Sequence, residues 1–189
     1  TLMRITIEAT VHAPPNRVWA AWNDPRAIEQ WNAATPDWHT PLASVGLREG
    51  GRFCSRMEAK AGSAGFDFEG TYTKIEAEQL IEYAMSDGRK VHVEFIPAAN
   101  SVTVRETFDV EDMHSAEQQR QGWQAILDNF TRYVEGAACP KPPMDWITPT
   151  KAASSNRSIS SSRCARPLGV NEAFYGESFV ELWSLDGLA

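Results

Sequence analysis

The most regular spacing of apolar positions in the chain lies between residues 115 and 135. Bulky apolar side chains recur there at steps of three and four residues from Trp123 to Val134, and polar side chains fall largely between them. Ser115 and Gln118 have the spacing of a capping box, in which each side chain satisfies a backbone N–H at a helix start. The pattern predicts an amphipathic helix over 115–135, roughly 30 Å long at 1.5 Å per residue.

Ahead of this helix the pattern changes to strict alternation. Residues 3–11 alternate apolar and polar side chains with the period of a half-buried strand. Two short amphipathic helices follow over 16–22 and 24–31, the second with Asp24 as N-cap and Pro25 at its first position. About six further strands run to residue 108, separated by turn signals.

These elements predict an α+β domain over residues 1–136. Strands joined by hairpins give an antiparallel sheet, here of about seven strands, and the long helix has an apolar face wide enough to cover one side of it. Residues 137–189 differ sharply in composition, with four prolines in 139–149 and six serines in 154–162. This pattern predicts a low-complexity Pro/Ser-rich tail with a possible short helix over 171–185.

Composition and charge narrow the class of protein. The chain has 189 residues, 42% hydrophobic and 23% charged, and a formal net charge of −7. The acidic balance argues against a nucleic-acid partner, whose binders usually carry a basic patch. The sequence also lacks a run of about 18 apolar residues and any signal-peptide pattern at its start, so we expect a cytoplasmic protein with no membrane partner.

Motifs of the common catalytic and metal sites are missing from the sequence. There is no Ser-His-Asp or Cys-His order, no glycine-rich phosphate loop and no HExxH spacing. The three cysteines stand far apart, without a CxxC pair or a nearby histidine. The sequence therefore predicts neither a metal site nor a bound cofactor.

Several short segments resemble those of a known family. They are the segments at 18–25 (VWAAWNDP), 37–39 (DWH), 50–53 (GGRF), 56–60 (RMEAK), 65–72 (GFDFEGTY), 106–108 (ETF) and 121–123 (QGW). With the order of elements, they resemble the START-like (SRPBCC) superfamily, and within it the branch named after the activator of the heat-shock-protein ATPase. The resemblance covers about residues 3–135. It implies a helix-grip fold, in which a curved antiparallel sheet wraps a long C-terminal helix and leaves a ligand cavity between them.

In a cavity of this kind, residues on the inward faces of the strands and helices would contact the ligand, and these residues are the candidates. They are Trp31, Trp38, His39, Phe53, Met57, Phe68, Tyr72, Tyr83, Glu106, Phe108, Trp123 and Leu127. Most are apolar or aromatic, as in typical small-molecule pockets, and a few polar groups would fix the ligand's orientation.

Among these candidates, Glu106 has the side chain best suited to acid/base chemistry or to anchoring a polar ligand group. It alternates with Val102, Val104 and Phe108 and should point inward with them, and an inward carboxylate must be hydrogen-bonded, paired or protonated. It is either a structural group, in an ion pair or at a bent strand end, or a ligand anchor or general acid/base.

Three functions remain open at this point. The first is a small-molecule binding protein for an apolar or aromatic ligand. The second is a cyclase- or hydrolase-type enzyme that uses Glu106 for acid/base chemistry, assisted by Tyr72 or His39. The third is a co-chaperone-like interaction module with a protein partner, for which only the segment 174–183 offers an apolar surface. A fold alone does not choose among them.

Overall fold

The computed structural model describes residues 3–136, which form one sheet and three helices. In chain order the elements are β1 (Arg4–Val11), α1 (Pro15–Asn23), α2 (Pro25–Trp31), β2 (Trp38–Val45), β3 (Arg52–Ala59), β4 (Gly65–Glu76), β5 (Leu80–Met85), β6 (Lys90–Pro97), β7 (Val102–Asp109) and α3 (Ala116–Gly136). The predicted tail and its possible helix over 171–185 lie outside the described residues.

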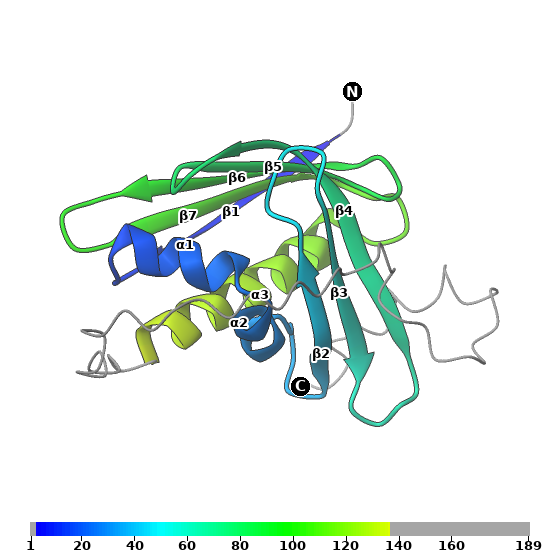
Figure 1. The fold of residues 1–189 in the computed structure, drawn as a ribbon. Coiled ribbons are helices and arrows are strands. Elements are labelled where there is room, and N and C mark those ends of the chain that lie inside the picture. Colours follow the sequence, from blue (N-terminus) through cyan, green and yellow to red (C-terminus); the bar gives the residue numbers. More distant parts are fainter. Residues whose placement is uncertain (1–2, 137–189) are drawn as a thin grey trace, which may run out of the picture.

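The seven strands form a single antiparallel sheet. Its order is β1-β7-β6-β5-β4-β3-β2, so every neighbour is joined by a hairpin except β1, which pairs with the last strand. The register shifts between His39 and Leu42 in β2 and between Tyr72 and Lys74 in β4. Such irregularities bend a sheet. Figure 1 shows the result: β2, β3 and β4 turn steeply away from the direction of β6 and β7, and α3 lies inside the bend.

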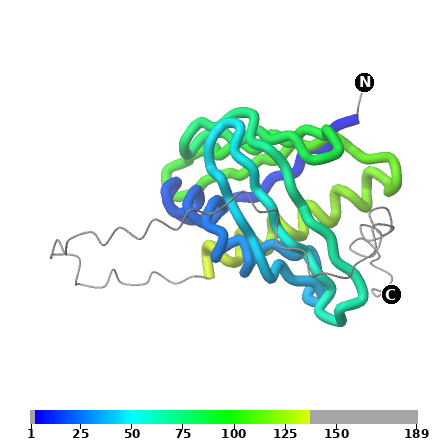
Figure 2. The backbone as a smooth tube through the Cα atoms, turned by 45° about the vertical axis from the view of Figure 1, so that its right-hand side comes forward, coloured from blue at the N-terminus to red at the C-terminus, as the bar shows by residue number. Residues whose placement is uncertain are grey.

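Helix α3 begins with the predicted capping box. The backbone N–H of Gln118 donates to Ser115 Oγ at 3.2 Å, and the backbone N–H of Ser115 donates to Gln118 Oε1 at 3.1 Å. The buried residues of α3 recur at helical spacing and include Trp123, Leu127 and Phe130. Among the strands, α3 packs most closely against β1. The turned view in Figure 2 shows the curved strands passing over the long helix.

The two short helices close one end of the layer between sheet and α3. The Asp24 side chain accepts a hydrogen bond from the backbone N–H of Arg26 at 3.0 Å, which confirms the predicted N-cap of α2. Trp22 and Trp31 contact Phe130 of α3, with ring centroids 4.9 and 5.0 Å apart and edge-to-face geometry. This aromatic contact fixes α1 and α2 against α3.

The predicted fold class is confirmed: an α+β helix-grip domain whose curved sheet holds the C-terminal helix. Two elements differ in extent from the sequence pattern. The aromatic-rich sequence of residues 37–41 predicts a connection, but β2 begins at Trp38. The alternation of β4 reaches Tyr72, but the strand continues beyond the bulge to Glu76. A bulge breaks the period-2 alternation, so a strand that contains one looks shorter in sequence than it is. In the described part of the chain, no helix has the length and apolarity to cross a bilayer.

Candidate functional site

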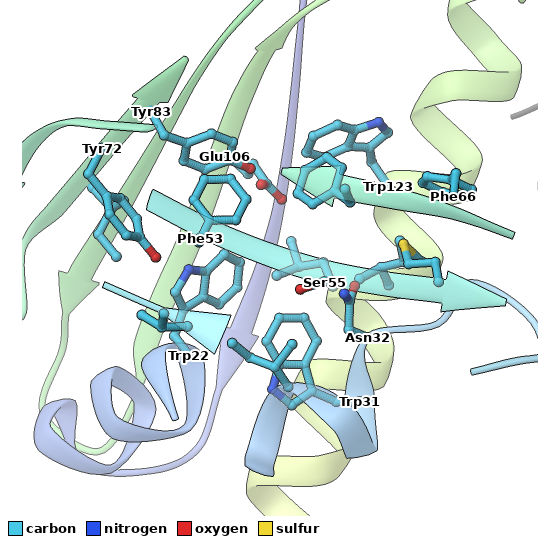
Figure 3. Close-up of a pocket in the computed structure, with 17 residues that line it drawn as sticks. Trp22, Trp31, Asn32, Phe53, Ser55, Phe66, Tyr72, Tyr83, Glu106 and Trp123 are labelled. Atoms are coloured by element: carbon cyan, nitrogen blue, oxygen red, sulfur yellow. The ribbon is translucent and has the colours of Figure 1, made fainter. Parts of the chain in front are cut away.

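A cavity of about 100 Å³ lies between the inner face of β3, β4 and β5 and the helices. Its buried lining consists of Ile28, Trp31, Phe53, Ser55, Met57, Tyr72, Ile81, Tyr83, Glu106, Trp123 and Leu127. Its half-exposed lining consists of Trp22, Asn32, Val45, Phe66, Phe68 and Ile126. Figure 3 shows these side chains converging from strands and helices on a common space. The site is therefore a buried apolar pocket with a half-exposed rim.

Local geometry explains why these residues meet. On β3, alternation turns Phe53, Ser55 and Met57 to the same face, and all three line the cavity. On α3, Trp123 and Leu127 are four residues apart and lie on one side of the helix with Ile126 between them. The strands thus provide one wall and α3 the facing wall.

Aromatic rings make up much of the strand wall. Phe53 contacts Tyr83 edge to face with centroids 4.8 Å apart, and it contacts Tyr72 at 5.2 Å. Phe68 contacts the α3 residue Trp123 edge to face at 6.0 Å, which joins the two walls. Rings in these arrangements are held rigidly by their neighbours. A ligand would therefore meet preformed aromatic faces and edges.

Glu106 is a buried carboxyl group within this apolar lining, with 6% of its surface exposed. Its partners on the adjacent strands are Ile7 of β1 and Val93 of β6, neither of which can neutralise it. Burial raises the pKa of Glu106 to about 8, and the hydrogen bond from Tyr83 offsets part of that rise. Among the described residues Glu106 has no ion pair. The inward orientation predicted from alternation is confirmed, and the structural ion pair is not present there.

The two tyrosines that line the cavity are also strongly affected by burial. Burial raises the pKa of Tyr72, and burial together with the neighbouring Glu106 raises the pKa of Tyr83 well above its ordinary value. Both hydroxyls are therefore neutral hydrogen-bonding groups at physiological pH. Figure 3 shows the Tyr83 hydroxyl beside the Glu106 carboxyl group.

A second polar group of residues lies apart from Glu106. Figure 3 shows the Ser55 hydroxyl and the Asn32 amide close to one another within the lining. The backbone carbonyl of Asn32 accepts a hydrogen bond from Thr40 Oγ1 at 2.6 Å, which ties the end of α2 to β2. The cavity therefore offers polar contacts at two places, with aromatic surface between them.

Nine of the twelve candidate residues predicted from the sequence line the cavity: Trp31, Phe53, Met57, Phe68, Tyr72, Tyr83, Glu106, Trp123 and Leu127. Trp38, His39 and Phe108 do not, so their predicted position in the lining is corrected. Phe108 is fully buried and stacks behind Trp123 with centroids 4.2 Å apart, so the tryptophan separates it from the cavity.

Trp38 and His39 are displaced for a different reason. Both belong to β2, the edge strand on that side of the sheet, rather than to a loop over the cavity. Trp38 is buried against Phe66, with ring centroids 6.0 Å apart. His39 pairs across the sheet with Glu58, whose carboxylate accepts a hydrogen bond from Arg56 Nε at 2.8 Å. Arg56 and Glu58 point to the face of β3 opposite Phe53 and Met57, because alternate residues of a strand point to opposite faces.

Eight lining residues are additional to those proposed from the sequence: Trp22, Ile28, Asn32, Val45, Ser55, Phe66, Ile81 and Ile126. Strand alternation could have found Ser55 and Phe66, which share their faces with predicted cavity residues. The contribution of Trp22 and Asn32 depends on how α1 and α2 pack on the sheet. No periodicity along the chain reports that packing.

Ionisable groups of the lining are Glu106, Tyr72 and Tyr83; the described lining contains no lysine, arginine or histidine. Across residues 3–136, no three His, Cys, Asp or Glu side chains gather closely enough to hold a metal ion. The chemistry available in the described cavity is therefore hydrogen bonding, proton exchange at Glu106 and aromatic contact.

A curved sheet that grips a long helix, with a cavity between them, defines the helix-grip class of the SRPBCC superfamily. The chain belongs to the family of Activator of Hsp90 ATPase homolog 1-like proteins, whose family model matches residues 12–135. The sequence-based resemblance is thus confirmed. A comparison with curated proteins found no match.

Solved structures include close relatives of known fold. The AHSA1-like protein from Aeromonas hydrophila is 53% identical, with a TM-score of 0.68, over 71% of this chain and 94% of that one. A protein from Cytophaga hutchinsonii is 44% identical, with a TM-score of 0.63, over 70% of this chain and 92% of that one. A protein from Chromobacterium violaceum, 22% identical with a TM-score of 0.62, shares the fold.

Proposed function

We propose that the protein is a small-molecule binding protein that takes an apolar or aromatic ligand between the sheet and α3. The observation that carries this proposal is the aromatic cavity, whose described lining contains one carboxyl group. Ligand pockets are typically apolar, with a few polar groups that orient the ligand. A cavity of about 100 Å³ is on the order of the 150 Å³ engineered cavity that admits one benzene molecule, so the ligand body that fits is about one ring.

Tryptophan fluorescence tests this proposal directly, because Trp22, Trp31 and Trp123 line the cavity. The protein is titrated with a panel of single-ring aromatic and small apolar compounds, the size that the cavity admits, and a saturable change is expected for at least one class. Ser55→Phe places a ring in the cavity and should abolish the change. Ser44→Phe, at an exposed position of β2, is the matched control and should retain it. Absence of any saturable response in the parent protein would overturn the proposal.

Enzymatic acid/base chemistry in the same cavity is a second candidate, favoured by one observation. Glu106 opens into the cavity, its pKa is about 8, and the Tyr83 hydroxyl is a second protic group beside it. A buried carboxylic acid that titrates near neutrality is suited to general acid catalysis. Here Tyr83 assists, in place of the Tyr72 or His39 predicted from the sequence. Mass spectrometry of panel compounds after incubation would detect conversion, and Glu106→Gln should remove it.

A further inference from the structure

The ionisable side chains in the described lining of the cavity are all acids. Its ionisable groups are one carboxyl and two phenols, and none of the described lining residues is basic. An anionic ligand would therefore find no counter-charge there and would lie near a group that repels it once ionised. Neutral and cationic ligands face no such penalty.

Glu106 also has unused hydrogen-bonding capacity. A carboxylate has about four acceptor sites, and Tyr83 is the single side chain that donates to it within the described residues. The neighbouring Ile7 and Val93 offer no side-chain donor. Figure 3 shows the carboxyl group directed at the space between Phe53, Tyr83 and Trp123. A ligand group placed in that space would meet the free acceptor positions.

Rings surround that space at large angles to one another. Phe53 and Tyr83 are 77° apart in plane, and Phe68 and Trp123 are 76° apart. A ring attracts a cation at its face, within about 6 Å of its centroid, and several rings around one point form an aromatic cage. The carboxyl group therefore lies where aromatic faces can also stabilise positive charge.

We propose that the cavity selects ligands that carry a basic nitrogen on an aromatic or apolar body, and that the ligand's ammonium group pairs with Glu106. This inference rests on the proposed ligand-binding function and names its ligand class. Aromatic and apolar side chains hold the ligand body, and the carboxylate with its surrounding rings holds the ammonium.

Proton release should accompany this binding. With a pKa of about 8, empty Glu106 is mostly protonated at neutral pH, and it must lose that proton to pair with an ammonium ion. The titratable group in contact with it is Tyr83 on β5; Tyr72 on β4 lines the same cavity, and both phenols are neutral in this range. The basic group that acts electrostatically on Tyr83 is Arg89, which is itself paired with Asp87. The neighbours of Glu106 on β1, β6 and α3 are uncharged. Affinity for an amine should therefore rise up to about tenfold per pH unit below about pH 8.

Three near-isosteric probes test the ligand class: benzylamine, benzyl alcohol and benzoate. Each is titrated into the nitrogen-15-labelled full chain, and the tryptophan indole N–H signals are followed at about pH 6, 7 and 8, where linkage predicts the change. We expect benzylamine to bind most tightly and benzoate most weakly, and benzylamine alone to bind more tightly as the pH rises. The signals that move should include those of Trp22, Trp31 and Trp123, which line the cavity.

Glu106→Gln removes the charge while keeping the shape. It should weaken benzylamine binding by about tenfold or more at the upper pH, abolish its pH dependence and leave benzyl alcohol within about twofold. Glu94→Gln is the matched control, since this carboxylate on neighbouring β6 is 39% exposed and outside the cavity, so its removal tests general attraction by the acidic protein. Binding of amine should persist in that variant.

The possible results distinguish failure of the amine inference from failure of the proposed binding function. If benzyl alcohol or benzoate binds as tightly as benzylamine, or if Glu106→Gln leaves the preference intact, the amine inference is wrong and the binding cavity stands. If none of the three probes gives a saturable shift of the cavity tryptophans, the binding function and the amine inference fall together.

Discussion

The two halves of the sheet pack in different ways against the same helix. The β1, β6 and β7 half presents mostly branched aliphatic side chains, such as Val93 and Val104, which are fully buried, and its two inward rings, Phe95 and Phe108, pack against tryptophans. The β3, β4 and β5 half presents large rings, such as Phe53 and Tyr83, and encloses the cavity. Aromatic side chains thus predominate in the emptier half.

The difference lies in the shape of the side chains and the curvature of the sheet. Branched aliphatic side chains interdigitate under a helix and leave few voids. Toward β3 and β4 the sheet bends around the helix (Figure 1), and rigid flat rings that brace one another there cannot collapse into the space between sheet and helix. Glu106 lies at the boundary: its strand belongs to the aliphatic half, and its carboxyl group opens into the aromatic half.

Removing one phenyl ring from a close-packed position on α3 and one from the cavity wall on β4 should give unequal losses of stability. Phe130 is fully buried between Trp22 and Trp31, so Phe130→Ala should cost roughly 3–5 kcal/mol of unfolding free energy. Phe68 is half-exposed beside existing empty space, so Phe68→Ala should cost roughly 1–2 kcal/mol. Urea unfolding followed by circular dichroism measures both. Equal losses would contradict the distinction between a close-packed region and a cavity wall.

The carboxyl at the boundary should make stability depend on pH. Its pKa is raised from 4.5 to about 8 in the folded protein, so the folded state binds more protons than the unfolded state between these values. Stability from this group is therefore present below about pH 4.5 and is lost as the pH rises toward 8, at up to roughly 1.4 kcal/mol per unit.

Glu106→Gln should flatten this dependence and make the variant more stable than the parent at pH 8, because a neutral amide has no charge to desolvate. Urea midpoints across the pH range give the comparison. Parallel pH profiles for parent and variant would show that Glu106 is not the group responsible.

Gly70 of β4 lies close to both the backbone of neighbouring β5 and the ring of Phe53 in the cavity wall. A Cβ at this position would lie 2.6 Å from the carbonyl oxygen of Ala84 and 2.8 Å from the ring of Phe53. Gly70→Ala should therefore cost roughly 1–3 kcal/mol and shift Phe53 relative to the cavity. Gly136→Ala is the control, because a Cβ there meets nothing within 4 Å. Thermal unfolding of both variants tests the contrast, and an unchanged melting temperature in Gly70→Ala would refute it.

Loss of the cap at the start of α3 should have the smallest effect. Ser115→Ala removes the oxygen that accepts the N–H of Gln118, and should cost about 1 kcal/mol. Because the cap is remote from the lining residues, ligand affinity should stay unchanged while the urea midpoint falls. A change in affinity without a change in stability would show that the cap acts on the cavity rather than on the helix.

Sequence periodicity was sufficient for the elements, because each depends on neighbours within a few residues. Alternation along β7 placed Glu106 inward, and the Ser115–Gln118 spacing gave the start of α3. The same rule assigned Phe108 to the cavity, since it shares a strand face with Glu106. Phe108 lies farther along β7 than Glu106, and at that point of the strand it stacks behind Trp123, outside the cavity. Alternation identifies the face of a curved sheet but not the depth beneath a helix.

Contacts between distant elements account for the other differences. Trp22 reaches the lining through the packing of α1 against α3, where its ring contacts Phe130. His39 lies outside the lining because its strand, β2, is the edge strand of the sheet. Both outcomes depend on where whole elements lie relative to one another, and local spacing carries no information on that.

The pairing of the first strand with the last has a consequence for the order in which the protein is made. Arg4 of β1 pairs with Asp109 of β7, and its Nε lies 2.9 Å from Asp109 Oδ1, across 105 positions of the chain. At a synthesis rate of roughly 5–20 residues per second, β1 waits about 5–20 s for its partner strand to be translated. During that interval Ile5 and Ile7 have no strand beside them in this sheet. The edge of β1 that pairs with β7 is thus open to other chains only in the nascent chain, whereas the opposite edge of β1 has no neighbouring strand in the described sheet even in the finished domain.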